Sequence, residues 1–133
     1  MPVKVKVCGI TNADDAVWAV NLGASFIGFN FWSESPRSVS VKHVKEMVAK
    51  IPPFIHTVGV FVNAENKEIE SVVRRTGIQY VQLHGTETPE QISELKGKNM
   101  KIIKAFRVNG AQDTALLETM SGMIDYVLYD TYV

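Results

Sequence analysis

The sequence predicts an α/β domain built around a parallel sheet. Short apolar segments rich in β-branched and aromatic residues alternate with segments of helical periodicity along the 133 residues. The apolar segments start about 20 to 30 residues apart, which suits one strand, one helix and two short loops. They are largely continuous in apolar character, as expected for strands buried on both faces of a parallel sheet. Regular alternation of strands and helices is typical of this fold class.

Six segments are expected to form strands. In chain order they are Val3–Cys8, Phe26–Phe31, His56–Val62, Tyr80–His84, Lys101–Phe106 and Asp125–Asp130. No linker or low-complexity tract interrupts them, so we predict one domain over residues 1–133. The order is five strand–helix units followed by a sixth strand.

The five intervening segments carry helix signals. Good N-terminal residues are Asn12, Ser40 and Thr88, the last followed by a proline. Helix ends are expected at Gly23, Pro52, Gly77, Gly97 and Gly122. In chain order, the expected apolar stripes are Val17 and Val20; Val44, Met47, Val48 and Ile51; Ile69, Val72 and Val73; Ile92 and Leu95; and Leu116, Leu117 and Met120.

Two parallel architectures fit this order of elements. An open, doubly wound sheet of five or six strands is an ordinary structure for 133 residues. A closed (β/α)8 barrel needs roughly 200 to 250 residues. Length alone therefore favours the open sheet.

Charge and cysteine content exclude several functional classes. Fourteen basic and fourteen acidic residues cancel, so the basic footprint of a nucleic-acid-binding protein is missing. No apolar run reaches the roughly 18 residues of a membrane span, and Met1–Lys4 lacks the apolar core of a signal peptide. The single cysteine, Cys8, rules out an internal disulfide, and His43 and His56 have no partner at metal-ligand spacing. We expect a cytoplasmic protein without a metal ion.

The working residues of parallel α/β folds lie at the C-terminal ends of the strands. Here those ends carry Cys8, Asn30–Trp32, Asn63, His84, Arg107 and Asp130. The chain has no Gly-x-Gly-x-x-Gly and no Gly-Lys-Ser/Thr, so neither a dinucleotide site nor a P-loop is indicated. Residue type alone leaves a core thiol at Cys8, a solvated carboxylate at Asp130 and an exposed guanidinium at Arg37 as open alternatives.

The segment Lys6-Val7-Cys8-Gly9-Ile10-Thr11 resembles the opening strand of phosphoribosylanthranilate isomerases, which are (β/α)8 enzymes of tryptophan biosynthesis. Further segments are similar, in matching order, to the second, third, fourth and sixth strands of that family: Gly28–Phe31 with Ser35–Arg37, Val58–Asn63, Val81–Gly85 with Glu87, and Leu128–Thr131. The resemblance implies a partial (β/α)8 TIM barrel of five βα units plus a sixth strand. The glycine-rich loops after strands seven and eight, which hold the substrate phosphate in this family, have no counterpart in the sequence.

The resemblance also implies an activity. Family members catalyse an Amadori rearrangement that converts N-(5'-phosphoribosyl)anthranilate into the 1-deoxyribulose 5-phosphate aminoketose, with no metal or organic cofactor. Cys8 matches the general base and Asp130 the general acid, and a proton donor near neutral pH is expected to be buried among apolar groups such as Leu128. Arg37 matches the residue that meets the anthranilate carboxylate, which a guanidinium grips with two hydrogen bonds. His84 is a further candidate for substrate contact, with a hydrogen bond to a neighbouring loop as the alternative.

Two other functions remain open on the sequence. A flavodoxin-like binding or signalling module would carry a cluster of acidic residues after its first strand, where this chain has Cys8 and Gly9. An inactive barrel fragment would keep the fold without the activity. Because six strands of an eight-stranded barrel leave two unpaired edges, the expected partners are a phosphosugar substrate and either a second copy of the chain or a missing C-terminal barrel segment.

Overall fold

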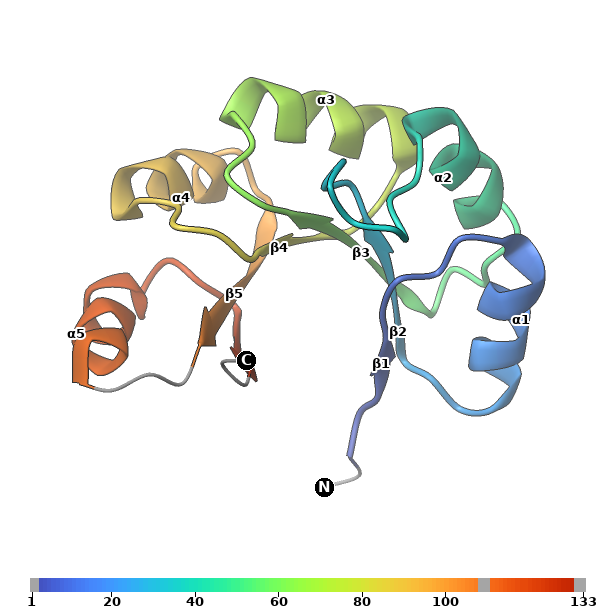
Figure 1. Ribbon diagram of the computed structural model, residues 1–133, viewed down its shortest axis with the longest axis horizontal. Helices are drawn as coiled ribbons and strands as arrows, with labels where there is room; N and C mark the ends of the chain where they lie inside the picture. The colour runs from blue at the N-terminus through green and yellow to red at the C-terminus, as the bar shows by residue number, and fades with distance from the viewer. Residues whose placement is uncertain (1–2, 108–110, 131–133) are drawn as a thin grey trace.

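The computed structural model describes residues 3–107 and 111–130 as a curled sheet with helices along its outer face (Figure 1). The strands are β1 (Lys6–Val7), β2 (Phe26–Asn30), β3 (His56–Phe61), β4 (Tyr80–Leu83), β5 (Lys101–Arg107) and β6 (Tyr126–Asp130). The helices are α1 (Ala13–Asn21), α2 (Val41–Val48), α3 (Asn66–Thr76), α4 (Pro89–Lys96) and α5 (Ala111–Met120). Thr131, the last residue of the sixth strand motif, lies outside the described residues.

The strand order decides between the two architectures. The strands lie side by side in chain order from β1 to β6, and every neighbouring pair is parallel. A doubly wound sheet reverses its strand order at a switch point, which places helices on both faces. Here the order never reverses and the helices gather on one face, so the sheet is a partial (β/α) barrel (Figure 1). The barrel prediction is confirmed and the flavodoxin-like alternative is wrong.

The two faces of the sheet carry different cores. Between the strands and the helices lies a large core that includes Ile27, Phe29, Leu83 and Ile102, each fully buried. The concave face carries a smaller group: Phe26, Val58, Tyr80 and Ile103, with Leu128 against it. Alternate side chains along each strand supply the two cores, because successive residues of a strand point to opposite faces.

The edge strands are less buried than the continuous apolar pattern predicts. Strand β1 keeps only Lys6 and Val7 of the expected strand Val3–Cys8, and Val3 and Val5 are exposed, although the Val5 carbonyl accepts from the backbone N–H of Phe26. At the other edge, Tyr129 of β6 is 62% exposed. Each edge strand has a partner on one side only within the described residues, which leaves its other side open. Burial on both faces is confirmed for β2 to β4.

The predicted helix caps are confirmed. Asn12 accepts from the backbone N–H of Asp15, and Ser40 accepts from that of His43. Thr88 forms a capping box with Gln91. Gly77 ends α3 in the left-handed region, at φ 79°, which favours glycine.

Two helix predictions need correction. Helix α1 buries Ala16 and Ala19, whereas Val17 is 42% exposed. The small alanines let the helix lie close to the sheet, and that contact is not visible in the local pattern. Helix α2 ends at Val48 rather than at Pro52, and Ile51 is buried in the turn that follows it. A proline disfavours helical backbone at the residue before it, so the helix finishes earlier.

Candidate active site

Cys8 follows β1 directly and its side chain is exposed. A β-carbon added to Gly28 on β2 would lie 3.0 Å from Cys8 Sγ, so the thiol stands over bare backbone. A core thiol is therefore the wrong reading of Cys8. The side chain is placed where a molecule at the C-terminal rim of the strands can reach it.

Arg37 reaches back to the end of β1. A β-carbon added to Gly9 would lie 2.7 Å from Arg37 Nη1, so the guanidinium crosses the backbone next to Cys8. The loop that carries Arg37 is tied to β2, because Val39 donates its N–H to the Asn30 carbonyl at 3.0 Å. The structure thus brings the predicted base and the predicted carboxylate-binding residue to one place.

This contact makes Gly9 a sensitive position. Gly9 has φ +80°, in the left-handed region, and a side chain there would collide with Arg37. We expect Gly9→Ala to lower the free energy of unfolding by more than the roughly 1 to 2 kcal/mol that left-handed backbone alone costs an L-residue, because the added methyl group must also displace Arg37. Denaturant titration measures this. Gly23→Ala is the matched control, since it has φ +103° and open space around it. An equal loss in both variants would mean that Arg37 does not press on Gly9.

His84 and Asp130 form a pair across the rim. His84 Nε2 lies 3.2 Å from Asp130 Oδ2, with the side chains 24% and 46% exposed. The predicted burial of Asp130 among apolar groups is therefore wrong for the described chain, because β6 has a neighbour on one side only. Among the described residues, the side chain of His84 contacts Gln82 on β4 and Asp130 on β6 rather than a neighbouring loop, so the predicted alternative is not what these residues show.

Behind this pair, two more side chains lie inside the curl of the sheet. Gln82 Nε2 lies 3.4 Å from His84 Nδ1, and Lys6 Nζ donates to Gln82 Oε1. Gln82 is 3% exposed. Burial lowers the pKa of Lys6, and the nearby Cys8 opposes that shift. Sequence reasoning missed Lys6 and Gln82, although both are polar residues within apolar strands and that signal was available.

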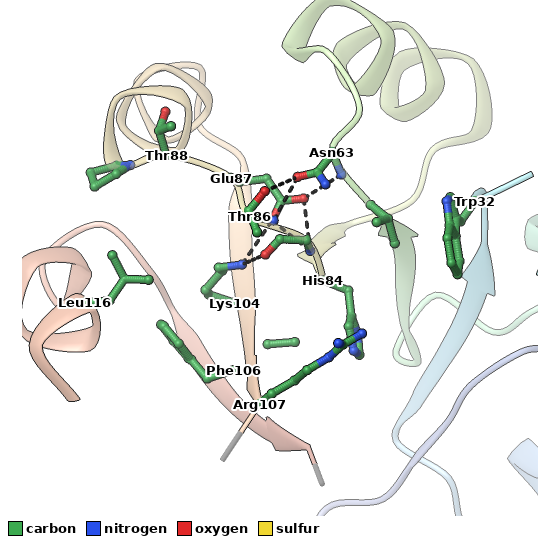
Figure 2. A pocket seen from close by; sticks show the side chains of 14 residues that line it. Trp32, Asn63, His84, Thr86, Glu87, Thr88, Lys104, Phe106, Arg107 and Leu116 are labelled. Atoms are coloured by element: carbon green, nitrogen blue, oxygen red, sulfur yellow. Dashed lines mark hydrogen bonds and ion pairs between the residues drawn. The ribbon is translucent and has the colours of Figure 1, made fainter. Parts of the chain in front are cut away.

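A buried ion pair supports the loop between β4 and α4 (Figure 2). Lys104 Nζ lies 3.0 Å from Glu87 Oε1 and donates to the Gly85 carbonyl at 2.7 Å. Glu87 also accepts from the backbone N–H groups of Asn63 and Gly85, each at 2.9 Å. Sequence reasoning missed Lys104, whose signal is a lysine within the apolar strand β5. The network holds the chain immediately after His84 in one position.

A cavity of about 570 Å³ opens beside this network. Its lining includes Trp32, Asn63, His84, Phe106 and Arg107, which are labelled in Figure 2. Of the four residues that the resemblance singles out, His84 lines it, while Cys8, Arg37 and Asp130 lie elsewhere on the rim. The other strand-end residues Trp32, Asn63 and Arg107 line it as well. The site is thus divided into two parts, with Cys8 and Arg37 near β1 and His84 and Asp130 on β4 and β6.

Metal ligands and membrane segments are not found in the described ranges. Residues 3–107 and 111–130 contain no group of three His, Cys, Asp or Glu side chains placed to hold a metal ion. Across those same residues, no helix combines the length and apolar character that crossing a membrane requires.

Comparison with known proteins identifies the family. Residues 5–132 match the family model described as N-(5'-phosphoribosyl)anthranilate (PRA) isomerase. The chain belongs to the PRA isomerase family. The predicted resemblance and the barrel-type fold are both confirmed.

Several PRA isomerases are similar over nearly the whole chain. The protein from Stutzerimonas stutzeri is 41% identical over 134 residues, covering 100% of this chain and 63% of that protein. The one from Gloeothece citriformis is 37% identical, covering 98% and 60%. The solved structure from Thermotoga maritima superposes with a TM-score of 0.89 at 35% identity, covering 99% of this chain and 63% of that one. The chain therefore spans 60 to 63% of the length of these relatives.

Proposed function

We propose that this chain forms the larger part of an isomerase that rearranges N-(5'-phosphoribosyl)anthranilate to its 1-deoxyribulose 5-phosphate aminoketose, a step of tryptophan biosynthesis. The observation that carries the proposal is the joint placement of Cys8, Arg37 and Asp130 at the C-terminal rim of a PRA isomerase fold. Another solved PRA isomerase, with a TM-score of 0.89 and 35% identity, is a complex with reduced 1-(O-carboxyphenylamino)-1-deoxyribulose 5-phosphate. That ligand supports a phosphosugar carrying a carboxyphenylamino group as the substrate class.

Asp130 and Cys8 divide the proton transfers between them. The Asp130 carboxyl group donates a proton to the ring oxygen, the bond from that oxygen to C1 breaks, and the nitrogen lone pair forms the C1=N bond of a Schiff base. The Cys8 thiolate then takes the proton from C2, and the C–H electron pair forms the C1=C2 bond of an enolamine while the nitrogen becomes neutral. Tautomerisation of the enolamine yields the ketone. The thiolate, not the thiol, is the form that accepts a proton.

Arg37 orients the substrate in this scheme. A guanidinium binds a carboxylate through two parallel hydrogen bonds, and Arg37 lies over Gly9, the residue after Cys8. A carboxylate bound there would place the attached nitrogen, and with it C1 and C2, near the thiol. Orientation of this kind lowers the entropic part of the barrier.

The open edges of the sheet define the proposed partner. Strands β1 and β6 each have one neighbour among the described residues, so backbone N–H and C=O groups face outward along both edges. A related solved structure is described as monomers generated from a dimeric isomerase of Thermotoga maritima. For this chain we propose that two further βα units fill the gap between β6 and β1, cover Asp130, and supply the phosphate-binding loops. We call the chain joined to that remaining part of the Stutzerimonas stutzeri relative the completed enzyme.

The substrate class can be tested at Arg37. In the completed enzyme, Arg37→Met should raise KM for N-(5'-phosphoribosyl)anthranilate by roughly 10 to 100-fold, equal to about 1.5 to 3 kcal/mol for a charged hydrogen bond. Steady-state kinetics measure this. The control substrate is the analogue without the ring carboxylate, for which wild type and variant should have equal KM. Equal losses for both substrates would contradict the role of Arg37 in carboxylate binding.

A further inference from the structure

A continuous run of polar contacts crosses the inside of the sheet from β1 to β6. Lys6 Nζ donates to Gln82 Oε1, Gln82 Nε2 lies 3.4 Å from His84 Nδ1, and His84 Nε2 lies 3.2 Å from Asp130 Oδ2. Lys6 stands two residues before Cys8. The run therefore joins the strand of the proposed base to the proposed acid.

The Lys6 ammonium, at one end of this run, determines which group donates and which accepts in each hydrogen bond. The Lys6 ammonium can only donate, so it must face the oxygen of the Gln82 amide. The amide nitrogen, which can only donate, then faces His84 Nδ1. Nδ1 must accept, which leaves the proton of the neutral imidazole on Nε2. The hydrogen bond at one ring nitrogen thus determines which nitrogen carries the proton.

We propose that Lys6 and Gln82 hold His84 in the Nε2–H tautomer, and that His84 is thereby a positioning residue that donates to Asp130 Oδ2. This proposal rests on the proposed isomerase function for its catalytic meaning. With Oδ2 occupied by the imidazole, the proton that Asp130 donates to the substrate is carried by its other oxygen. The imidazole fixes the rotation of a carboxyl group that is 46% exposed on an edge strand.

The other two histidines of the chain provide internal references. His43 Nε2 lies 2.6 Å from the Thr11 carbonyl oxygen, which can only accept, so His43 is the Nε2–H tautomer. His56 Nδ1 lies 3.1 Å from Gln79 Oε1, so His56 is the Nδ1–H tautomer. His56 and His84 thus each face a glutamine through Nδ1, but one meets the amide oxygen and the other the amide nitrogen.

The test is the nitrogen NMR spectrum of histidine-labelled chain at about pH 8, above the reference imidazole pKa of about 6.5. Correlations through bonds between the ring nitrogens and the hydrogens on the ring carbons report which nitrogen is protonated. Variants in which each histidine is replaced in turn by glutamine assign the signals of the three histidines. We expect Nε2–H at His43 and His84 and Nδ1–H at His56. A His84 signal of the Nδ1–H form, or a mixture while His43 and His56 keep their forms, would overturn the proposal.

Variants of the two glutamines sharpen the test. Gln82→Glu places a carboxylate oxygen against His84 Nδ1, so the proton of the neutral imidazole should move from Nε2 to Nδ1. Gln79→Glu is the matched control: His56 Nδ1 faces an oxygen before and after the change, so its protonated nitrogen should stay the same. Lys6→Met removes the donor that orients the amide, so His84 should become a mixture of tautomers. An unchanged His84 signal in Gln82→Glu would overturn the proposal. The same spectra of the completed enzyme provide the measurement if the isolated chain does not fold.

Kinetics of the completed enzyme test the link to catalysis. Gln82→Glu should lower kcat by roughly tenfold or more while KM changes by less than about threefold, because an imidazole with its proton on Nδ1 no longer donates to Asp130 while the substrate contacts remain. Gln79→Glu should leave both constants unchanged. A tautomer change without loss of kcat would show that His84 does not position a catalytic Asp130. If the completed enzyme has no isomerase activity at all, the proposed function fails, and the spectra still decide the tautomer.

Discussion

Cys8→Ala should lower kcat of the completed enzyme by about 100-fold or more, the usual contribution of a general base. The thiolate is the proposed acceptor of the C2 proton, and an alanine methyl group accepts none. KM should change little, since the proposed binding contacts come from Arg37 and from the phosphate loops. Steady-state kinetics with N-(5'-phosphoribosyl)anthranilate measure both constants.

Folding can be separated from chemistry in this variant. The Cys8 side chain is exposed, so its truncation should leave the thermal midpoint nearly unchanged. Cys8→Ser is the companion variant, because it keeps the size of the side chain but replaces the thiol by a weaker acid. It should be about as slow as Cys8→Ala. A kcat within about threefold of wild type in either variant would remove Cys8 from the role of base.

The isolated 133-residue chain should show no measurable isomerase activity, and joining it to the remaining barrel units should restore turnover. Two free sheet edges leave both faces of β6 open, as Tyr126 and Tyr129 at 44% and 62% exposure show. The phosphate-binding loops are also needed, because their binding energy positions the sugar between Cys8 and Asp130. Turnover by the isolated chain and by the completed enzyme, measured side by side, gives the result.

Two further measurements complete that comparison. The completed enzyme carrying Cys8→Ala shows whether the restored activity belongs to this chain rather than to a contaminating isomerase. Size-exclusion chromatography of the isolated chain should show self-association or aggregation through the open edges. An isolated chain that is monomeric and fully active would contradict the need for two further βα units.

Local signals in the sequence were sufficient for the order of elements and for the rim of the site. The caps at Ser40 and Thr88 and the left-handed Gly77 depend on neighbours within one helical turn, so the sequence around them contains the needed information. The strand ends likewise indicated Cys8 and Asp130 as candidates, whereas the roles proposed for them came from the resemblance to the isomerase family.

Only the tertiary structure decided how the strands are arranged and which side chains meet. Strand order distinguishes a barrel from a doubly wound sheet, but both architectures have the same alternation of strands and helices along the sequence. The contact of Arg37 with Gly9, the pair of His84 and Asp130, and the buried pair of Lys104 and Glu87 join residues from different βα units. Such contacts depend on the curl of the sheet, which the periodicity of a single segment does not encode. Within the described residues β6 has a neighbour on one side only, which is why Asp130 is half exposed here although its predicted role requires burial.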